Sequence, residues 1–207
     1  TGEILHAEGF NEFVIKSAED EMVTERFLAD FDVLILAQRN LREKTCKMIR
    51  KYSQDGGNLI AFRPDSNLYD VFGITGSDGQ VKEGYLRPEK PVSEETGFTS
   101  GPFQYHGKSE SYITPDSSVI ASLCSSDGSP SVYPAIAANR FGKGNAVVFS
   151  YNLPETVVLT RQGNPESAAA EKDGIPGLRP MDLFTGGWID TSLNAVNQAD
   201  LHMNLLS

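Results

Sequence analysis

The stretch from Phe31 to Gly73 most constrains the fold, because it reads as two strands joined by a helix. A continuous apolar run, Val33 to Ala37, predicts a strand buried on both faces of a parallel sheet. The following segment, Leu41 to Tyr52, places its apolar side chains on one helical stripe, and glycines end it. A second apolar run then covers Leu59 to Phe62. Such a β-α-β unit predicts two parallel strands joined by a right-handed crossover.

Polar residues follow both predicted strands, and they define the candidate site. In open α/β sheets, ligands bind outside the carboxyl ends of the strands. We therefore expect a ligand pocket there, lined by a set of charged side chains from several segments: Glu8, Arg63, Asp65, His106 and Arg161. Each has a structural alternative. Arg63 and Asp65 could pair with each other, His106 could be a buried hydrogen-bonding group, Arg161 could anchor its loop, and Glu8 could be a helix-end charge.

The segments before and just after this unit alternate helix and strand, which is typical of an α/β fold. The predicted elements are a helix, a strand, a second helix and, after the unit, a short helix: Gly2 to Phe10, Asn11 to Lys16, Glu19 to Ala29 and Asn67 to Phe72. From Ile74 to Gly107 the periodicity fades, and we expect a long irregular excursion with a strand at Val81 to Leu86.

Regular patterns return in the second half as an antiparallel region. Three strands are expected there, with turns at Asp127-Gly128 and Gly142-Lys143-Gly144: Ser118 to Leu123, Val132 to Asn139 and Asn145 to Tyr151. Pro154 then marks the start of a helix. The prediction is a single domain over residues 1–207, in which 164–207 form an extended tail that packs on it and ends in a helix from Gln198 to Leu206. The chain begins without methionine, and we expect it to be part of a longer protein.

Composition excludes several classes of partner and cofactor. The 18 Lys and Arg against 28 Asp and Glu give a net charge of −10, which argues against nucleic acid or an anionic membrane as partner. Cys46, expected off the apolar stripe of its helix, and Cys124, expected at a strand end, form neither a disulfide framework nor a metal motif. The segment from Glu171 to Asp182 lacks most positions of a calcium loop, and no phosphate-binding glycine loop is present. No metal or cofactor is therefore predicted.

Several motifs together resemble a known family. The motifs AEGFNEF, DVLILAQ, DGGNLIAFRPD, YHG, RFGKGNAVVFSY and RQGNP are similar to the class I glutamine-amidotransferase-like family. The nearest branch is the one attached to carbohydrate-active proteins, similar to the trimerisation domain of bacterial β-galactosidases. This resemblance implies a flavodoxin-like α/β fold, with a mainly parallel central sheet and helices on both faces. In that family a strand usually precedes the first helix, and none is present here.

The resemblance also implies that the amidotransferase reaction is lost. Enzymes of the family need a cysteine on the turn after a core strand and a histidine further on. The matching turn here runs from Arg63 to Ser66 and contains no cysteine, while Leu153 stands at the position of the histidine. We therefore expect a catalytically inactive domain with a binding or assembly role in a carbohydrate-processing protein.

Two other functions stay open at this point. One is a hydrolase or amidotransferase that uses a non-standard site of His106, Asp65 and Glu8, and the other is an oligomerisation module. The expected partners are a carbohydrate or small polar ligand, other domains of a longer chain and further copies of this one. No membrane-spanning run or signal peptide is visible, so we expect a soluble protein. A carbohydrate-active parent chain from a bacterium would place it outside the cytoplasm.

Overall fold

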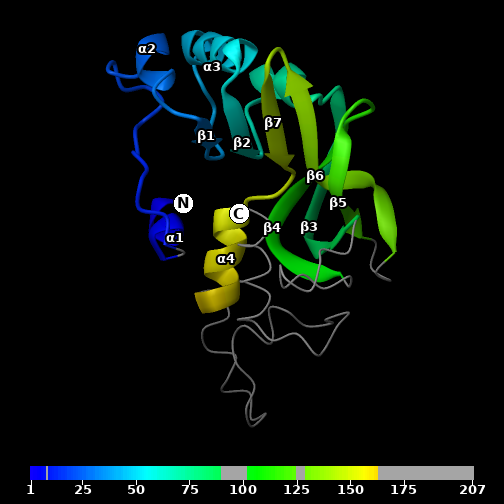
Figure 1. Cartoon of the computed structure of the whole chain (residues 1–207). Coiled ribbons are helices and arrows are strands. Elements are labelled where there is room, and N and C mark those ends of the chain that lie inside the picture. The colour runs from blue at the N-terminus through cyan, green and yellow to red at the C-terminus, as the bar shows by residue number, and fades with distance from the viewer. Residues whose placement is uncertain (8, 90–101, 125–128, 163–207) are drawn as a thin grey trace.

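The protein folds around one seven-stranded mixed sheet with the strand order β1-β2-β7-β6-β5-β3-β4. A computed structural model describes residues 1–7, 9–89, 102–124 and 129–162 (Figure 1). The strands are β1 (Val33–Leu36), β2 (Asn58–Phe62), β3 (Gly76–Pro88), β4 (Phe103–Ile113), β5 (Ser118–Cys124), β6 (Pro130–Phe141) and β7 (Gly144–Phe149). The helices are α1 (Gly2–Ala7), α2 (Glu25–Leu28), α3 (Glu43–Asp55), η1 (a 3-10 helix, Ser66–Phe72) and α4 (Leu153–Gln162).

The sheet has a parallel half and an antiparallel half. β1 and β2 run parallel, as the β-α-β pattern predicted, and β7 also pairs parallel with β2. β7, β6, β5, β3 and β4 pair antiparallel. The predicted α/β class and the antiparallel second half are confirmed. The expectation of a mainly parallel sheet holds only for the first three strands of the order. The flavodoxin-like arrangement stays a prediction.

Side chains of β2 alternate between two apolar clusters, one on each face of the sheet. Leu59 and Ala61 face α3 and η1, where Ile49 and Leu68 lie in the same buried cluster. Phe62 faces the opposite way, into a cluster that reaches β5, β6 and α4. This period of two is what a strand covered on both faces requires.

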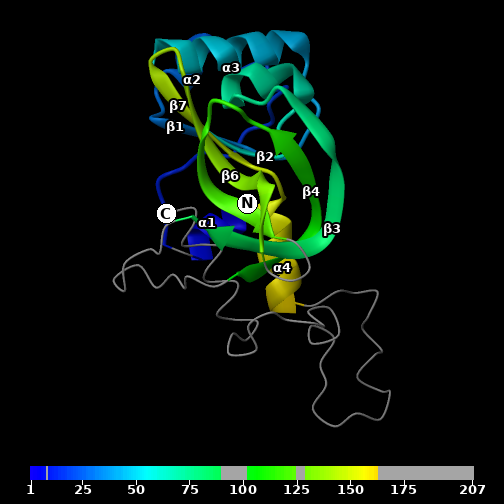
Figure 2. The ribbon, with the colours of Figure 1, turned by 90° about the vertical axis from the view of Figure 1, so that its right-hand side faces the viewer.

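The antiparallel strands curl so that β4 returns to the parallel half (Figure 2). The backbone N–H of Glu110 in β4 donates to the carbonyl of Ser150, just after β7, over 2.8 Å. An isolated antiparallel bridge joins Ser109 to Tyr151. The last strand of the order therefore lies against the carboxyl end of β7, close to where β2 also ends.

Near the N-terminus one predicted strand has a different environment from the expected one, and two predicted elements are wrong. Among the described residues, β1 is the edge strand of the sheet, and its Val33 is exposed, so it is not buried on both faces as predicted. An apolar run shows that a strand's two faces can be covered, but it does not show whether the strand has a neighbour on each side. Residues 13–16 pair with no strand among the described residues, and a strand without a partner gains no ladder hydrogen bonds. The helix expected from Glu19 shrinks to α2, because Asp20 accepts from the N–H of Met22 and Thr24 caps the helix later.

In the described part of the excursion expected from Ile74 to Gly107, residues 74–89 and 102–107, the chain is largely regular. β3 has 13 residues and β4 has 11, and the two pair with each other over most of their length. Their sequences carry Gly, Ser and charged residues, which have weak strand propensity, so tertiary pairing rather than local preference forms them. The turn at Asp127-Gly128 and the tail 164–207 lie outside the described residues.

Candidate functional site

Arg63 stands at the carboxyl end of β2, and its backbone is in the left-handed region. Its φ is 48°, although it is not glycine, while its N–H still donates to the carbonyl of Phe149 over 3.0 Å. A residue held at positive φ costs free energy and persists only where its surroundings hold it. The turn after β2 is thus a strained strand end, at the place where ligands bind in α/β sheets.

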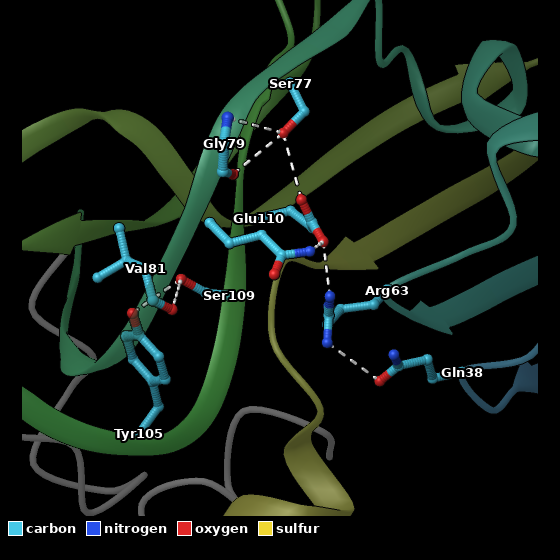
Figure 3. Close-up of polar contacts among 9 residues, drawn as sticks. Gln38, Arg63, Ser77, Gly79, Val81, Tyr105, Ser109 and Glu110 are labelled. Carbon is cyan, nitrogen blue, oxygen red and sulfur yellow. Dashed lines mark hydrogen bonds and ion pairs between the residues drawn. The ribbon is translucent and has the colours of Figure 1, made fainter.

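The guanidinium of Arg63 forms an ion pair with Glu110 of β4 (Figure 3). Nη2 lies 2.6 Å from Oε1, and the two side chains are only 12% and 14% exposed. Charges taken this far out of water need close partners, and each supplies the other. The pair therefore fastens the end of the parallel half to the returning antiparallel strand.

Three further polar side chains complete what we call the Arg63–Glu110 cluster. The carboxylate of Glu110 accepts from Nε2 of Gln80 over 2.7 Å and from Oγ of Ser77 over 3.3 Å. Nη1 of Arg63 donates to Oε1 of Gln38 over a longer 3.4 Å. Nε of Arg63 is buried without a hydrogen-bond partner in the described part of the chain. The cluster thus combines amide, hydroxyl, carboxylate and guanidinium groups, with one unused donor.

Asp65 has a structural duty two residues further on. Its Oδ1 accepts from the N–H of Asn67 over 2.8 Å, which caps η1, and its Oδ2 accepts from the N–H of Leu41 over 2.7 Å. Both carboxylate oxygens are therefore engaged by backbone donors. Asp65 joins the loop after β1 to the loop after β2 and holds the strand end in shape.

His106 is buried on β4 and hydrogen-bonds Glu83 of β3. Its Nδ1 lies 2.8 Å from Oε2 of Glu83, and Oε1 of the same carboxylate accepts from the N–H of Gly107, also over 2.8 Å. The backbone N–H and carbonyl of His106 both bond the hydroxyl of Thr156 in α4. Glu83 has φ 50°, so it is a second non-glycine residue at positive φ. This arrangement orients the imidazole firmly between the β3–β4 pair and α4.

The structure brings only part of the predicted set together. Arg63 and Asp65 share the strand end of β2, whereas His106 is bonded to Glu83 and lies four positions before Glu110 on β4. Arg161 belongs to α4, but its side chain lies outside the described part, as does all of Glu8. Sequence reasoning missed Glu110 because it lies in a strand that the sequence pattern did not predict. It missed Glu83 because its partner His106 lies 23 positions away in the chain.

Other side chains occupy the positions at which the resemblance places the catalytic residues of the amidotransferases. Ser66 begins η1, and Leu153 is fully buried at the start of α4. Cys46 is buried in the α3 cluster and not off the apolar stripe as expected, because the stripe of α3 extends over Thr45, Cys46, Ile49 and Tyr52. Burial raises the pKa of the Cys46 thiol above its ordinary value, which lowers its thiolate fraction.

Within the described ranges, no three His, Cys, Asp or Glu side chains converge as metal ligands. A cleft of about 490 Å³ lies at the other end of the parallel strands, among residues such as Arg26, Asp32, Lys51 and Asn58. It lies away from Arg63 and contains none of the predicted site residues. No helix in the described residues is long and apolar enough to cross a membrane.

Comparison with known proteins finds neither a family profile nor a curated protein that matches the chain. Solved structures do match it. A cytoplasmic protein of Salmonella typhimurium superimposes with a TM-score of 0.58 at 13% identity, over 99% of this chain and 83% of that one. The cold-adapted β-galactosidase of Rahnella sp. R3 gives 0.54 at 20% identity, over 70% of this chain and 23% of the enzyme.

The β-galactosidase of Bacillus circulans sp. alkalophilus gives 0.52 at 12% identity, over 71% of this chain and 24% of the enzyme. At these identities the likeness establishes a shared fold: an α/β domain of the kind also found as one part of β-galactosidases. The chain spans less than a quarter of the length of each of these two enzymes.

Proposed function

We propose that the chain is a catalytically inactive glutamine-amidotransferase-like domain with a binding or assembly role in a carbohydrate-processing protein. The fold it shares with about a quarter of two β-galactosidases supports a place beside such enzymes. A solved relative of the same fold is named as cytoplasmic, and the expectation of a compartment outside the cytoplasm gains no support from it.

The observation that carries the proposal is Arg63 at the strained strand end. An amidotransferase needs a thiolate on this turn, poised to attack the amide carbon. Here the residue at positive φ is an arginine whose guanidinium is already paired with Glu110. A guanidinium stays protonated and cannot act as a nucleophile.

Leu153 supports the same conclusion from the other half of the reaction. The resemblance assigns the general base to this position, and a fully buried leucine cannot move a proton. Loss of either member of a coupled nucleophile and base lowers turnover by several orders of magnitude. With both absent, the domain keeps the fold without the reaction.

The predicted ligand-binding residues remain part of this proposal, but their roles differ from one another. The Arg63–Glu110 cluster offers amide, hydroxyl and carboxylate groups that suit the hydroxyls of a carbohydrate or another small polar ligand. Asp65 acts by holding the strand end, and Glu8, His106 and Arg161 are proposed as the other walls.

Ammonia release from glutamine tests the inactive assignment. Wild type is compared with Ser66→Ala, which removes the one hydroxyl of the turn, and with His106→Ala, which removes the imidazole that Glu83 holds. We expect no release above the buffer rate from any of the three. Turnover in wild type that either substitution abolishes would overturn the proposal.

One observation favours a hydrolase as the second candidate. A buried imidazole oriented by a carboxylate, as in His106 with Glu83, is also how general bases are held. A panel of nitrophenyl esters and glycosides measures this activity. If the domain is a hydrolase, wild type should hydrolyse one of these substrates, and His106→Gln should lower the rate at least a hundredfold. Circular dichroism should show that the variant is folded.

A further inference from the structure

In the described part of the chain, one side of β1 has no neighbouring strand to bond its backbone groups. The carbonyl of Asp32 accepts from the N–H of Asn58 in β2. In a parallel ladder, successive residues direct their N–H and C=O groups to alternate sides. The backbone N–H and C=O of Leu34 therefore point to β2, while those of Val33 and Ile35 point away from it. In the described chain, no hydrogen bond reaches these outward groups.

The side chains of this edge are apolar without alternation. β1 reads Val-Leu-Ile-Leu, and Val33 is 45% exposed. The unpaired stretch at residues 13–16 adds Val14 and Ile15, which are 56% and 72% exposed. In Figure 1 this N-terminal stretch passes on the same side of the molecule as β1. A bare apolar edge is a template for an added strand, and proteins normally cover such edges.

Charges at the two ends of β1 define what the added strand must carry. Asp30 and Asp32 precede the strand, and Arg39 follows it soon after. All three side chains are exposed, and none of them forms a salt bridge within the described residues. A strand with a basic residue beside the aspartates and an acidic residue beside Arg39 would be complementary at both ends.

We infer that β1 accepts one additional β-strand from a partner polypeptide. That strand is apolar over about four residues, in proportion to the length of β1, and carries a basic residue at one end and an acidic residue at the other. Main-chain hydrogen bonds to Val33 and Ile35 supply the affinity, and the end charges supply the selectivity. The inference deepens the assembly role proposed above, and it names the face through which the domain is held.

Amide hydrogen exchange with designed peptides tests the inference. The probes are the peptides KVVIVD and DVVIVK, which cover both strand directions, and DVVIVD, which has the same apolar centre with acids at both ends. At saturating concentration, we expect one of the first two peptides to slow exchange at Val33 and Ile35 by about tenfold or more. DVVIVD should give a markedly smaller effect. Equal protection by all three, or none by any, overturns the inference.

Two variants make the test specific to the edge. Val33→Pro removes an outward N–H at the first residue of the strand and leaves the ladder to β2 in place, so it should abolish protection. Val33→Thr keeps the N–H and should retain it. Unchanged exchange of the β2 and β7 amides verifies that both variants are folded. Protection in the proline variant would overturn the inference.

A second copy of this chain is the competing occupant. If raising the protein concentration alone protects Val33 and Ile35 and doubles the mass in solution, the partner is another copy, and the inference is wrong. Glutamine turnover would contradict the proposed function but would leave these exchange rates unchanged. The two failures are therefore distinguishable.

Discussion

The carboxylate of Glu83 bonds His106 at Nδ1 and the next residue at its backbone N–H, both over 2.8 Å, from a backbone with φ 50°. Hydrogen bonds from a buried imidazole and a partly buried backbone N–H thus hold a glutamate in a conformation that usually belongs to glycine. The side chain stabilises the β3–β4 pair while its backbone destabilises it. Substitutions at this position separate the two effects.

We expect Glu83→Ala to lower the free energy of unfolding by about 2–3 kcal/mol, because one buried and one partly buried donor lose their acceptor. Glu83→Gly loses the same contacts but relieves the positive φ, so it should cost about 1 kcal/mol less than the alanine variant. Glycine normally destabilises a strand more than alanine does. A glycine variant more stable than the alanine variant would therefore identify the positive φ of Glu83 as the cause. Urea denaturation of the three proteins measures it, and alanine outperforming glycine would contradict the interpretation.

Arg63→Met should lower the free energy of unfolding by about 3 kcal/mol, because it leaves the nearly buried carboxylate of Glu110 without its cation. The double variant Arg63→Met with Glu110→Gln should recover a large part of that loss, since no charge then remains buried. Chemical denaturation of the single and double variants forms the test. Additive losses would mean that the two side chains do not act as a pair.

The two thiols should react at different rates in the folded protein. Cys46 is 1% exposed, and burial raises its pKa, whereas Cys124 at the end of β5 is partly exposed. We expect iodoacetamide at pH 8 to label Cys124 at least tenfold faster than Cys46. Peptide mass spectrometry locates the label, and equal rates in denaturant serve as the control. Faster labelling of Cys46 would show that the packing of α3 against the sheet does not bury this thiol.

Unfolding should become easier between pH 10 and pH 12. Burial raises the pKa of Tyr105 from 10 to about 12, and burial also raises that of Tyr151 well above its usual value. In this range the unfolded chain loses phenolic protons that the folded chain retains, so the free energy of unfolding falls as pH rises. For Tyr105 alone the loss across this range amounts to about 2 kcal/mol.

Tyr105→Phe tests this pH dependence directly. The variant should show a shallower fall in its urea midpoint between pH 10 and pH 12, whatever its stability at pH 7. Tyr133→Phe is a comparison of cause, because the hydrogen bond to Asp78, and not mainly burial, raises the pKa of this partly exposed phenol. An identical pH profile for Tyr105→Phe and wild type would rule out the assigned cause.

The candidate site was predictable only in its location. The pattern around Leu59 to Phe62 placed Arg63 and Asp65 at a strand end, and the structure has both there. The partners of Arg63 and His106 were not predictable, because Glu110 and Glu83 lie in strands with weak local preference. An ion pair across 47 positions of the chain and a hydrogen bond across 23 positions leave no periodic signal.

The sequence by itself determined the parallel pair β1 and β2, the strands β5, β6 and β7 and the helix α4. Apolar periodicity and glycine turns are local properties, so they can be read without knowing the neighbours. Only the tertiary structure decided that β1 stands at an edge, that residues 13–16 pair with no described strand and that β4 returns to the end of β7. These outcomes depend on which distant segments supply hydrogen-bond partners, and a strand's own residues do not encode its neighbour.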